Sequence, residues 1–279
     1  MTLGTALQQG TAILEKAAVP VARLTAEVLL CHALRADRAY LYAHSTDELT
    51  ELSWIHYGRY LDERLKGKPT QYITHNQEFF GRDFYVNEDV LIPRPETEHL
   101  VEAAMSYARR SAGARRILDV GTGSGAIAIS LALELGREVL ASDVSVKALG
   151  VAARNARTHS ARVSLFACDL LEAVRPGSID LLVSNPPYVP GGDSANMQTE
   201  VRDWEPHVAL FAGDTGLEVY RRLIAQATVA VKSAGRLYFE LGYRSLDGVR
   251  EILAAAPWGD FEVISDLAGW PRVIGATLA

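Results

Sequence analysis

The chain has 279 residues, of which 48% are hydrophobic and 22% charged, so it can form one large domain with a smaller companion and lies outside the disordered class. Its 28 basic and 34 acidic residues give a net charge of -6, which argues against a broad, non-specific grip on nucleic acid phosphates. Cys31 and Cys168 form no CxxC motif or Cys/His cluster, which argues against disulfide frameworks and structural zinc and predicts buried free thiols.

The first 75 residues show the spacing of helices. Leu24, Val28 and Leu29 in LTAEVLLCHAL fall on one side of a helix, and WIHYGRYLDERL repeats this period. This segment holds eight basic and eight acidic residues, so the whole negative excess lies in residues 76–279. We predict a small helical bundle over residues 1–75.

Residues 76–91 break the helical period. Aromatic and β-branched residues surround Gly81 in this segment, which predicts a β-hairpin that connects two domains. The sequence EHLVEAAMSYARR then predicts a helix with Thr97 or a neighbour as its N-cap. Arginines in the last turn of this helix interact favourably with the negative end of its dipole.

From residue 114 onward, short apolar runs alternate with amphipathic helices. Apolar runs of about 4 to 8 residues separated by helices are typical of parallel strands buried on both faces. We therefore predict a doubly wound α/β domain of about seven strands. The predicted strands are RILDV, EVLASD, RVSLFACD, IDLLVSN, GRLYFEL, FEVISD and RVIGATL.

The segment ILDVGTGSGAIAIS predicts a strand, a glycine-rich loop and a helix. Gly121, Gly123 and Gly125 allow the backbone to turn and to approach a ligand at distances that a Cβ atom forbids. The next strand ends at Asp143, where a carboxylate can accept hydrogen bonds from both hydroxyls of a ribose. This arrangement is typical of a site for a nucleotide-like ligand.

The glycine loop by itself leaves the ligand open. Gly121, Gly123 and Ala126 also satisfy the looser GxGxxA form of the dinucleotide fingerprint, which fits NAD. Asp119, however, stands at the end of the preceding strand, where an acid repels a pyrophosphate and attracts the ammonium group of a methionine moiety. Together with the D-x-G-x-G-x-G spacing, this acid favours S-adenosyl-L-methionine.

The segment IDLLVSNPPYVP places Asn185-Pro186-Pro187-Tyr188 at the carboxyl end of a strand, where open α/β sheets bind ligands. A Pro-Pro pair alone often does no more than end a strand. Here the Asn185 side chain and the Pro186 carbonyl offer acceptors for the N–H bonds of a planar amide or aromatic amine, and Tyr188 can stack on it. We predict methylation of such a nitrogen by orientation, without a strong general base.

Together these motifs resemble those of the HemK/PrmC family of S-adenosylmethionine-dependent methyltransferases. The resemblance covers nearly the whole chain and includes ILDVGTGSG, ASDVSVKAL, SNPPYVP, EVRDWEPHVALFAGDTGLEVYRRL and DLAGWPRVI. It implies an α/β fold with a Rossmann-like, seven-stranded methyltransferase sheet, a small N-terminal helical bundle and a β-hairpin connector. We expect domain boundaries at 1–75, 76–91 and 92–279, with the first domain recognising the substrate protein.

The resemblance also implies an activity and a set of residues. The family methylates the side-chain nitrogen (N5) of the glutamine in the Gly-Gly-Gln motif of class I peptide chain release factors. Asn185, Pro186, Pro187 and Tyr188 are expected to hold the glutamine amide, and no metal is expected. The residues expected to bind the cofactor are Gly121, Thr122, Gly123, Ser124, Gly125, Asp143, Asp169, Leu170 and Asn185. Leu170 stands where some relatives have a tryptophan.

Two further segments also match the family. The loop IPRPETE, residues 92–98, is expected to line the pocket; Arg94 in it either contacts the partner or is solvated, and Glu98 has no assigned role. His207 belongs to the motif Glu205-Pro206-His207, and we expect it to be structural because the reaction requires no base.

Three other functions fit parts of the pattern. A ribosomal protein glutamine methyltransferase is the nearest, although IPRPETE is more similar to the release-factor branch. DNA adenine N6-methylation shares the NPPY motif, but a pocket for a flipped base needs neighbouring phosphate contacts, and the catalytic part is acidic. A non-catalytic S-adenosylmethionine sensor is difficult to reconcile with an intact NPPY motif.

The chain shows no basic N-terminal segment followed by an apolar run, and no uninterrupted apolar stretch of about 18 residues. We therefore expect a cytoplasmic protein with no membrane partner. Class I release factors are the expected partner, without direct contact to nucleic acid, and we expect a monomer. The acidic catalytic part is better suited to a basic protein partner than to a DNA duplex.

Overall fold

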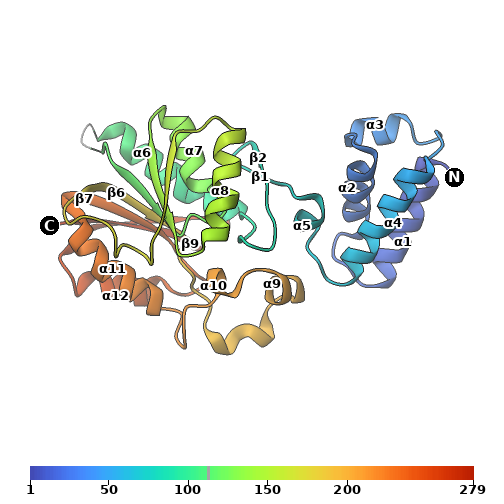
Figure 1. Cartoon of the computed structure of the whole chain (residues 1–279). Helices are drawn as coiled ribbons and strands as arrows, with labels where there is room; N and C mark the ends of the chain where they lie inside the picture. Colours follow the sequence, from blue (N-terminus) through green and yellow to red (C-terminus); the bar gives the residue numbers. More distant parts are fainter. Residues whose placement is uncertain (112–113) are drawn as a thin grey trace. The chain divides into compact units, whose positions relative to one another are not determined.

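The computed structural model describes residues 1–111 and 114–279, which divide into two compact units (Figure 1). Unit 1 consists of Met1–Asn76 together with Gln198–Trp204. Unit 2 consists of Gln77–Met197 and Glu205–Ala279. The chain therefore passes from one unit to the other three times.

Unit 1 is a bundle of helices around an apolar core. Thr2, Asp37 and Thr50 begin three of its helices as N-caps whose side chains accept a backbone N–H from the first turn. The five helices before residue 76 are α1 (Leu3–Lys16), α2 (Ala22–Leu34), α3 (Arg38–Ala43), α4 (Glu51–Leu65) and α5 (Thr70–Thr74). The helical character predicted for this segment is therefore confirmed.

The buried face of α2 differs in part from the predicted one. Leu29 is fully buried as expected, but Leu24 is 45% exposed. Ala26 and Leu30 occupy the core instead. The reason is that α2 carries apolar residues on two sides, so that spacing alone does not decide which side packs against α1 and α4.

A short helix from late in the chain also belongs to unit 1. This helix, α9 (Thr199–Trp204), carries Glu200, whose carboxylate accepts a hydrogen bond of 2.6 Å from the buried guanidinium of Arg64. The ammonium of Lys68 lies 5.6 Å from the centre of the Trp204 ring, in a cation–π contact. These contacts join α9 to the end of α4 and the residues that follow it.

Unit 2 begins with the predicted β-hairpin, which the structure confirms. Its strands are β1 (Gln77–Phe79) and β2 (Arg82–Phe84), paired antiparallel, with Phe80 and Gly81 at positive φ in the turn. The carboxylate of Glu98 accepts a hydrogen bond of 2.9 Å from the backbone N–H of Phe80. Glu98 thus holds the hairpin turn.

Thr97 occupies the predicted N-cap position of the helix that starts at Glu98, but its side chain does not cap this helix. A 3-10 turn, η1 (Pro95–Thr97), leads directly into α6 (Glu98–Arg110), so Thr97 itself has helical φ and ψ angles and its side chain caps no backbone N–H. Its hydroxyl instead accepts a hydrogen bond of 3.3 Å from the side chain of Asn185. Thr97, whose residue type is typical of a helix start, therefore lies beside the NPPY loop.

The core of unit 2 is a seven-stranded sheet with strand order β5-β4-β3-β6-β7-β9-β8. The first five strands in this order are parallel, whereas β9 pairs antiparallel with β7 and with β8. The predicted α/β class and strand number are confirmed. The strands are β3 (Ile117–Val120), β4 (Val139–Asp143), β5 (Val163–Ala167), β6 (Ile179–Ser184), β7 (Val231–Glu240), β8 (Trp258–Ser265) and β9 (Pro271–Leu278).

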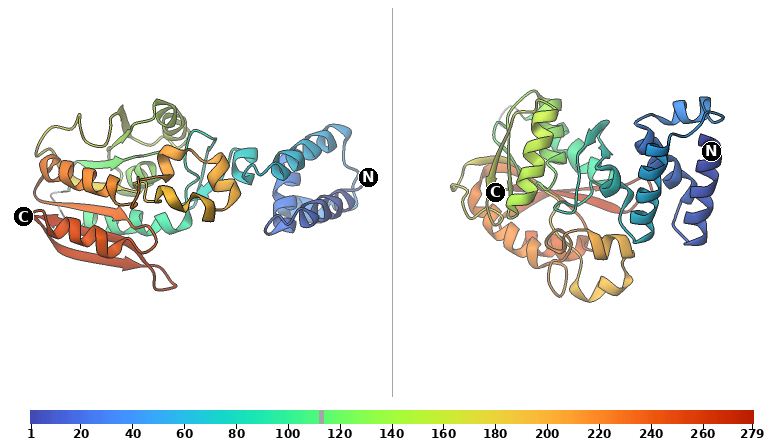
Figure 2. Two further views of the ribbon diagram at one scale, coloured as in Figure 1. Left: turned by 90° about the horizontal axis from the view of Figure 1, so that it is seen from below. Right: turned by 45° about the vertical axis from the view of Figure 1, so that its right-hand side comes forward.

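Helices cover both faces of this sheet, as Figures 1 and 2 show. α6, α7 (Ala126–Leu135) and α8 (Val146–Thr158) lie on one face, and α11 (Glu218–Ala230) and α12 (Leu246–Ala254) on the other. Neighbouring residues of β3 serve opposite cores, since Ile117 packs with α6 and α7 and Leu118 packs with α11 and α12. Burial on both faces explains why the strands are continuous apolar runs.

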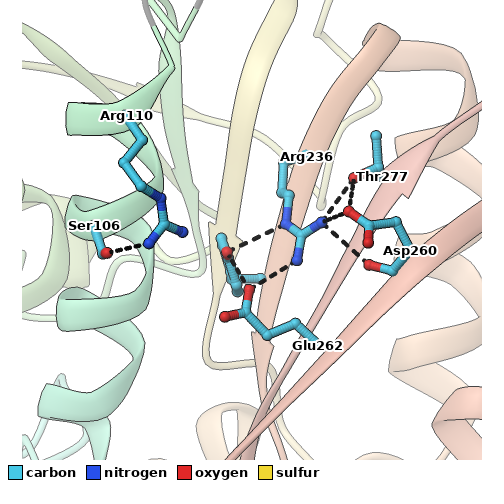
Figure 3. Close-up of polar contacts among 7 residues, drawn as sticks. Ser106, Arg110, Arg236, Asp260, Glu262 and Thr277 are labelled. Atoms are coloured by element: carbon cyan, nitrogen blue, oxygen red, sulfur yellow. Dashed lines mark hydrogen bonds and ion pairs between the residues drawn. The ribbon is translucent and has the colours of Figure 1, made fainter.

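The antiparallel edge of the sheet is held by a buried arginine, drawn in Figure 3. The guanidinium of Arg236 on β7 donates to Asp260 at 2.6 Å, to Glu262 at 2.8 Å and to the Thr277 hydroxyl at 2.7 Å. Its Nε also donates to the hydroxyl of Tyr238 at 3.2 Å. Because these partners come from β7, β8 and β9, one side chain links three strands.

We expect Arg236→Met to lower the free energy of unfolding by about 2 kcal/mol, because it removes charged hydrogen bonds from a buried position. Asp260→Asn should cost less than about 1 kcal/mol, since the Asp260 side chain is 81% exposed and water replaces its contacts. Urea unfolding of both variants measures the two changes. Equal losses of unfolding free energy in the two variants would show that the burial of Arg236 does not determine how much its contacts stabilise the fold.

Candidate active site

The carboxyl ends of β3, β4 and β6 meet at one edge of the sheet in unit 2, where they surround a cavity of about 310 Å³. The hairpin connector contributes Asp89, Val90 and Leu91 to its wall, rather than the predicted residues 92–98. Seven of the predicted site residues line the cavity. They are Gly121, Gly123, Asp143, Asp169, Leu170, Asn185 and Pro187.

The glycine loop follows β3 and is anchored to the end of β4. The Ser142 carbonyl accepts hydrogen bonds of 2.9 Å from the backbone N–H groups of both Gly121 and Thr122. Gly121, Gly123 and Gly125 all have positive φ angles, of 73°, 54° and 83°. Side chains other than glycine rarely adopt these angles, so the loop geometry requires the predicted glycine spacing.

Thr122, Ser124 and Gly125 do not line the cavity but hold the loop. The Thr122 hydroxyl donates to Asp119 at 2.6 Å, and Gly125 begins helix α7. The Ser124 carbonyl accepts a hydrogen bond of 2.8 Å from the side chain of Asn155 on α8.

Asp143 ends β4 with both carboxylate oxygens tied to the backbone. Oδ2 accepts from the N–H of Gly123 at 2.9 Å, and Oδ1 accepts from the N–H of Ser145 at 2.8 Å. Each oxygen keeps a further lone pair for a ligand hydroxyl. Burial raises the pKa of Asp143 above its ordinary value.

Asp119 lies beneath the glycine loop and is fully buried. Its Oδ2 accepts the Thr122 hydroxyl, whereas its Oδ1 has no hydrogen-bond partner. Burial raises the pKa of Asp119 to about 7. The predicted acid therefore does not line the cavity, and only its charge could act on a ligand there.

A further wall comes from the segment after β5. Asp169 and Leu170 line it, and Leu170 has a positive φ of 51°. The Asp169 carboxylate accepts a hydrogen bond of 2.7 Å from Arg222 on α11, which also lines the cavity. Sequence patterns did not indicate Arg222.

The NPPY loop follows β6, the strand beside β3. Asn185 and Pro187 line the cavity, while Pro186 and Tyr188 do not. The ring of Tyr188 packs so closely against Gly242 that a Cβ atom there would lie 2.6 Å from the ring. Burial raises the pKa of Tyr188 to about 12, so the phenol is neutral. Gly242 is a residue on which the loop depends and that the sequence reasoning missed.

The motif Glu205-Pro206-His207 supports the loop before α6. The buried carboxylate of Glu205 forms an ion pair with Arg94 and accepts a hydrogen bond of 3.2 Å from the backbone N–H of Ile92. Arg94 is therefore paired within unit 2. His207 packs edge-on against Phe211, with ring centres 5.3 Å apart.

These groups fit S-adenosylmethionine. The glycine loop leaves its backbone open to a ligand, and Asp143 offers two oxygens to a ribose diol. The unpartnered Oδ1 of Asp119 is a buried acceptor whose charge suits the ammonium of the methionine moiety. Val90, Leu91 and Phe211 provide apolar surface for a flat base.

Comparison with known proteins decides the family. The family model of the PrmC N-terminal domain matches residues 5–74, and that of the methyltransferase small domain matches residues 98–201. The chain is 45% identical to a release factor glutamine methyltransferase of Koribacter versatilis, over 98% of both chains. It is 40% identical to that of Nitratidesulfovibrio vulgaris, over 99% of this chain and 95% of the relative.

The chain belongs to the release factor glutamine methyltransferase family. The resemblance predicted from the motifs is thereby confirmed, and the protein is a methyltransferase. The relatives do not favour the ribosomal protein or DNA alternatives.

Solved structures share the fold of this release factor glutamine methyltransferase family member. A methyltransferase from Pyrococcus furiosus aligns with a TM-score of 0.53 at 18% identity, over 71% of this chain and 90% of its own. The T. thermophilus 16S rRNA methyltransferase RsmC, in complex with AdoMet and guanosine, aligns with a TM-score of 0.52 at 18% identity, over 73% of this chain and 50% of its own.

Within residues 1–111 and 114–279, no group of three His, Cys, Asp or Glu side chains is arranged to hold a metal ion. Among the same residues, no helix combines the length and apolar character that a membrane crossing requires.

We expect the affinity for S-adenosylhomocysteine to increase with pH between 6 and 8. The ligand ammonium favours the ionised form of Asp119, so binding releases a proton wherever this carboxyl is still protonated. With a pKa of about 7, the affinity should rise about tenfold over this range. Calorimetric titration measures it, and Asp119→Asn should flatten the profile. A flat profile in the unchanged protein would contradict the role of Asp119.

Proposed function

We propose that this protein transfers a methyl group from S-adenosyl-L-methionine to the side-chain amide nitrogen (N5) of the glutamine in the Gly-Gly-Gln motif of class I peptide chain release factors. The observation that carries this proposal is the NPPY loop at the wall of the cofactor cavity, with Asn185 and Pro187 lining it. The names of the relatives support the choice of substrate protein.

The cofactor supplies an electrophilic methyl group bound to a positively charged sulfur. Gly121, Gly123 and Asp143 would hold this cofactor, with the Asp143 carboxylate accepting hydrogen bonds from the ribose. Asp169 and Leu170 would flank the adenine. The buried charge of Asp119 favours a cationic ligand in this cavity, since charges interact strongly where water is excluded.

The glutamine amide requires orientation because its nitrogen lone pair is delocalised. We propose that the Asn185 side-chain oxygen accepts one N–H of the amide and that the Pro186 carbonyl accepts the other. Both prolines stiffen the loop, and neither has an N–H group that competes for these acceptors. Tyr188, held against Gly242, would stack on the flat amide.

Held in this way, the glutamine nitrogen forms a bond to the methyl carbon while the carbon–sulfur bond breaks and its electron pair returns to sulfur. The nitrogen then loses one proton to water, which leaves a neutral N-methyl amide. Correct orientation of two reactants can supply about 7 to 11 kcal/mol of a barrier, so no strong base is needed.

We expect the purified protein to transfer label from S-adenosylmethionine to a class I release factor, because its Gly-Gly-Gln glutamine fits the NPPY acceptors. A release factor in which this glutamine is replaced by alanine should take up no label. Mass spectrometry of the tryptic peptide checks the position of the methyl group. Equal labelling of both release factors would refute the proposal.

We further propose that the helical bundle of residues 1–75 recognises the release factor. Unit 1 presents large apolar side chains to solvent, among them Leu52 at 66% and Ile55 at 59% exposure, three residues apart on α4. Residues three apart lie on the same face of a helix, so these two form one apolar patch. Exposed apolar patches of this kind suit a protein partner.

Replacing both Leu52 and Ile55 by aspartate should raise KM for the full-length release factor about tenfold, a loss of about 1.4 kcal/mol of binding, and leave kcat unchanged. Val229→Asp, at a residue of α11 with 58% exposure, is the matched control in unit 2. Steady-state kinetics of the three proteins decide the matter. Unchanged KM in the double variant would remove this patch from the recognition surface.

We also propose that the protein acts as a monomer in the cytoplasm and without direct contact to nucleic acid. One chain supplies every group described at the site, which supports a monomer. The negative excess of the chain lies entirely in residues 76–279, which supports a basic protein partner over a nucleic acid.

A further inference from the structure

A buried carboxyl group lies directly behind the NPPY loop. Glu240 is the last residue of β7, which runs parallel to β6, and the register pairs Ser184 with Phe239. The next residues on the two strands, Asn185 and Glu240, are therefore neighbours. Glu240 is 3% exposed, and its Oε2 is buried without any hydrogen-bond partner.

Thr97 and Asn185 are the hydrogen-bond donors beside the Glu240 carboxylate, and both lower its pKa. Thr97 and Asn185 also contact each other, since Asn185 Nδ2 donates to Thr97 Oγ1 at 3.3 Å. The three side chains form a closed cluster, which we call the Glu240 cluster. Its members come from η1, from the loop after β6 and from the end of β7.

The hydrogens of the Glu240 cluster can be counted. The Asn185 amide has two N–H bonds, and the Thr97 hydroxyl has one O–H bond. One amide hydrogen goes to Thr97, and the other is available to the neighbouring Glu240 carboxylate. The Thr97 hydroxyl accepts from Asn185, which leaves its own hydrogen available to Glu240. If Glu240 accepts the second amide hydrogen, only the Asn185 Oδ1 is left for the cavity.

We propose that Glu240 is a positioning residue for methyl transfer, which fixes the Asn185 side chain with its oxygen toward the substrate. This inference rests on the proposed role of Asn185 as acceptor for the glutamine amide. An asparagine amide can turn over and exchange its oxygen and nitrogen at little steric cost. Without an acceptor behind it, the Asn185 NH2 group faces the substrate NH2 group, and the two donors repel each other.

The energetics of Glu240 support this role over a structural one. Burying a carboxylate costs free energy, and burial raises the pKa of Glu240 to about 7. A pKa above the unfolded value means that the ionised group destabilises the fold at neutral pH. The charged and titratable neighbours are Arg272, Glu96, Tyr188 and Tyr220, none of which pairs with Oε2.

The test compares Glu240→Leu with Glu240→Gln in single-turnover methylation of a release factor. Leucine offers no acceptor, so the Leu variant should react about 100-fold more slowly. Glutamine keeps one carbonyl acceptor for the cluster, so the Gln variant should recover most of the rate. Affinity for S-adenosylhomocysteine should be unchanged in both, and thermal unfolding of the Leu variant should occur at the same or a higher temperature.

A double-mutant cycle with Asn185→Ala shows whether Glu240 acts through Asn185. Glu240→Leu should slow the unchanged protein but add no loss to Asn185→Ala, because the group that it positions is already absent. Additive losses would overturn the proposal, as would a normal rate in Glu240→Leu or a parallel fall in cofactor affinity. Glu262→Gln, on the same sheet in the Arg236 network, is the control and should leave the rate unchanged.

The two proposals fail separately in this experiment. If the unchanged protein does not methylate the release factor glutamine, the proposed function is wrong. If it does so and Glu240→Leu is as fast, the proposed function stands and the role of Glu240 is wrong.

Discussion

The site depends on carboxyl groups that lie buried at the ends of parallel strands. Asp119 on β3, Asp143 on β4 and Glu240 on β7 all have raised pKa values because each has lost much of its water. Each one contacts a loop that the proposed reaction needs: Asp119 and Asp143 hold the glycine loop, and Glu240 contacts Asn185. The fold thus gives up stability at one edge of the sheet, where poorly solvated acceptors orient their neighbours.

Sequence patterns could predict those features of the fold and the site that depend on residues close together in the chain. The glycine loop and Asp143 could be recognised because the strand, the turn and the helix follow one another directly. The NPPY loop could be recognised because two prolines after a buried strand leave few conformations open. The seven strands of the sheet were visible as apolar runs for the same reason.

Sequence patterns could not predict contacts between segments that lie far apart in the chain. Thr97 precedes a helix and has the residue type of an N-cap, so its contact with Asn185 was invisible. Glu240 follows a run of apolar residues and could be interpreted only as the polar end of a strand. The antiparallel direction of β9 was likewise hidden, because a strand buried on both faces has the same apolar pattern in either direction. Arg94 is a third case, since its partner Glu205 lies more than a hundred residues further along the chain.

Helix α9 has a consequence for how this protein can be divided and recombined. It lies in the chain between the NPPY loop and Glu205, yet its contacts are with Arg64 and Lys68 of the N-terminal bundle. An exchange of the first 76 residues between two relatives would therefore combine the bundle of one protein with the α9 of the other. Because α9 packs within the same compact unit as the bundle, a working chimera should take both segments from the same parent.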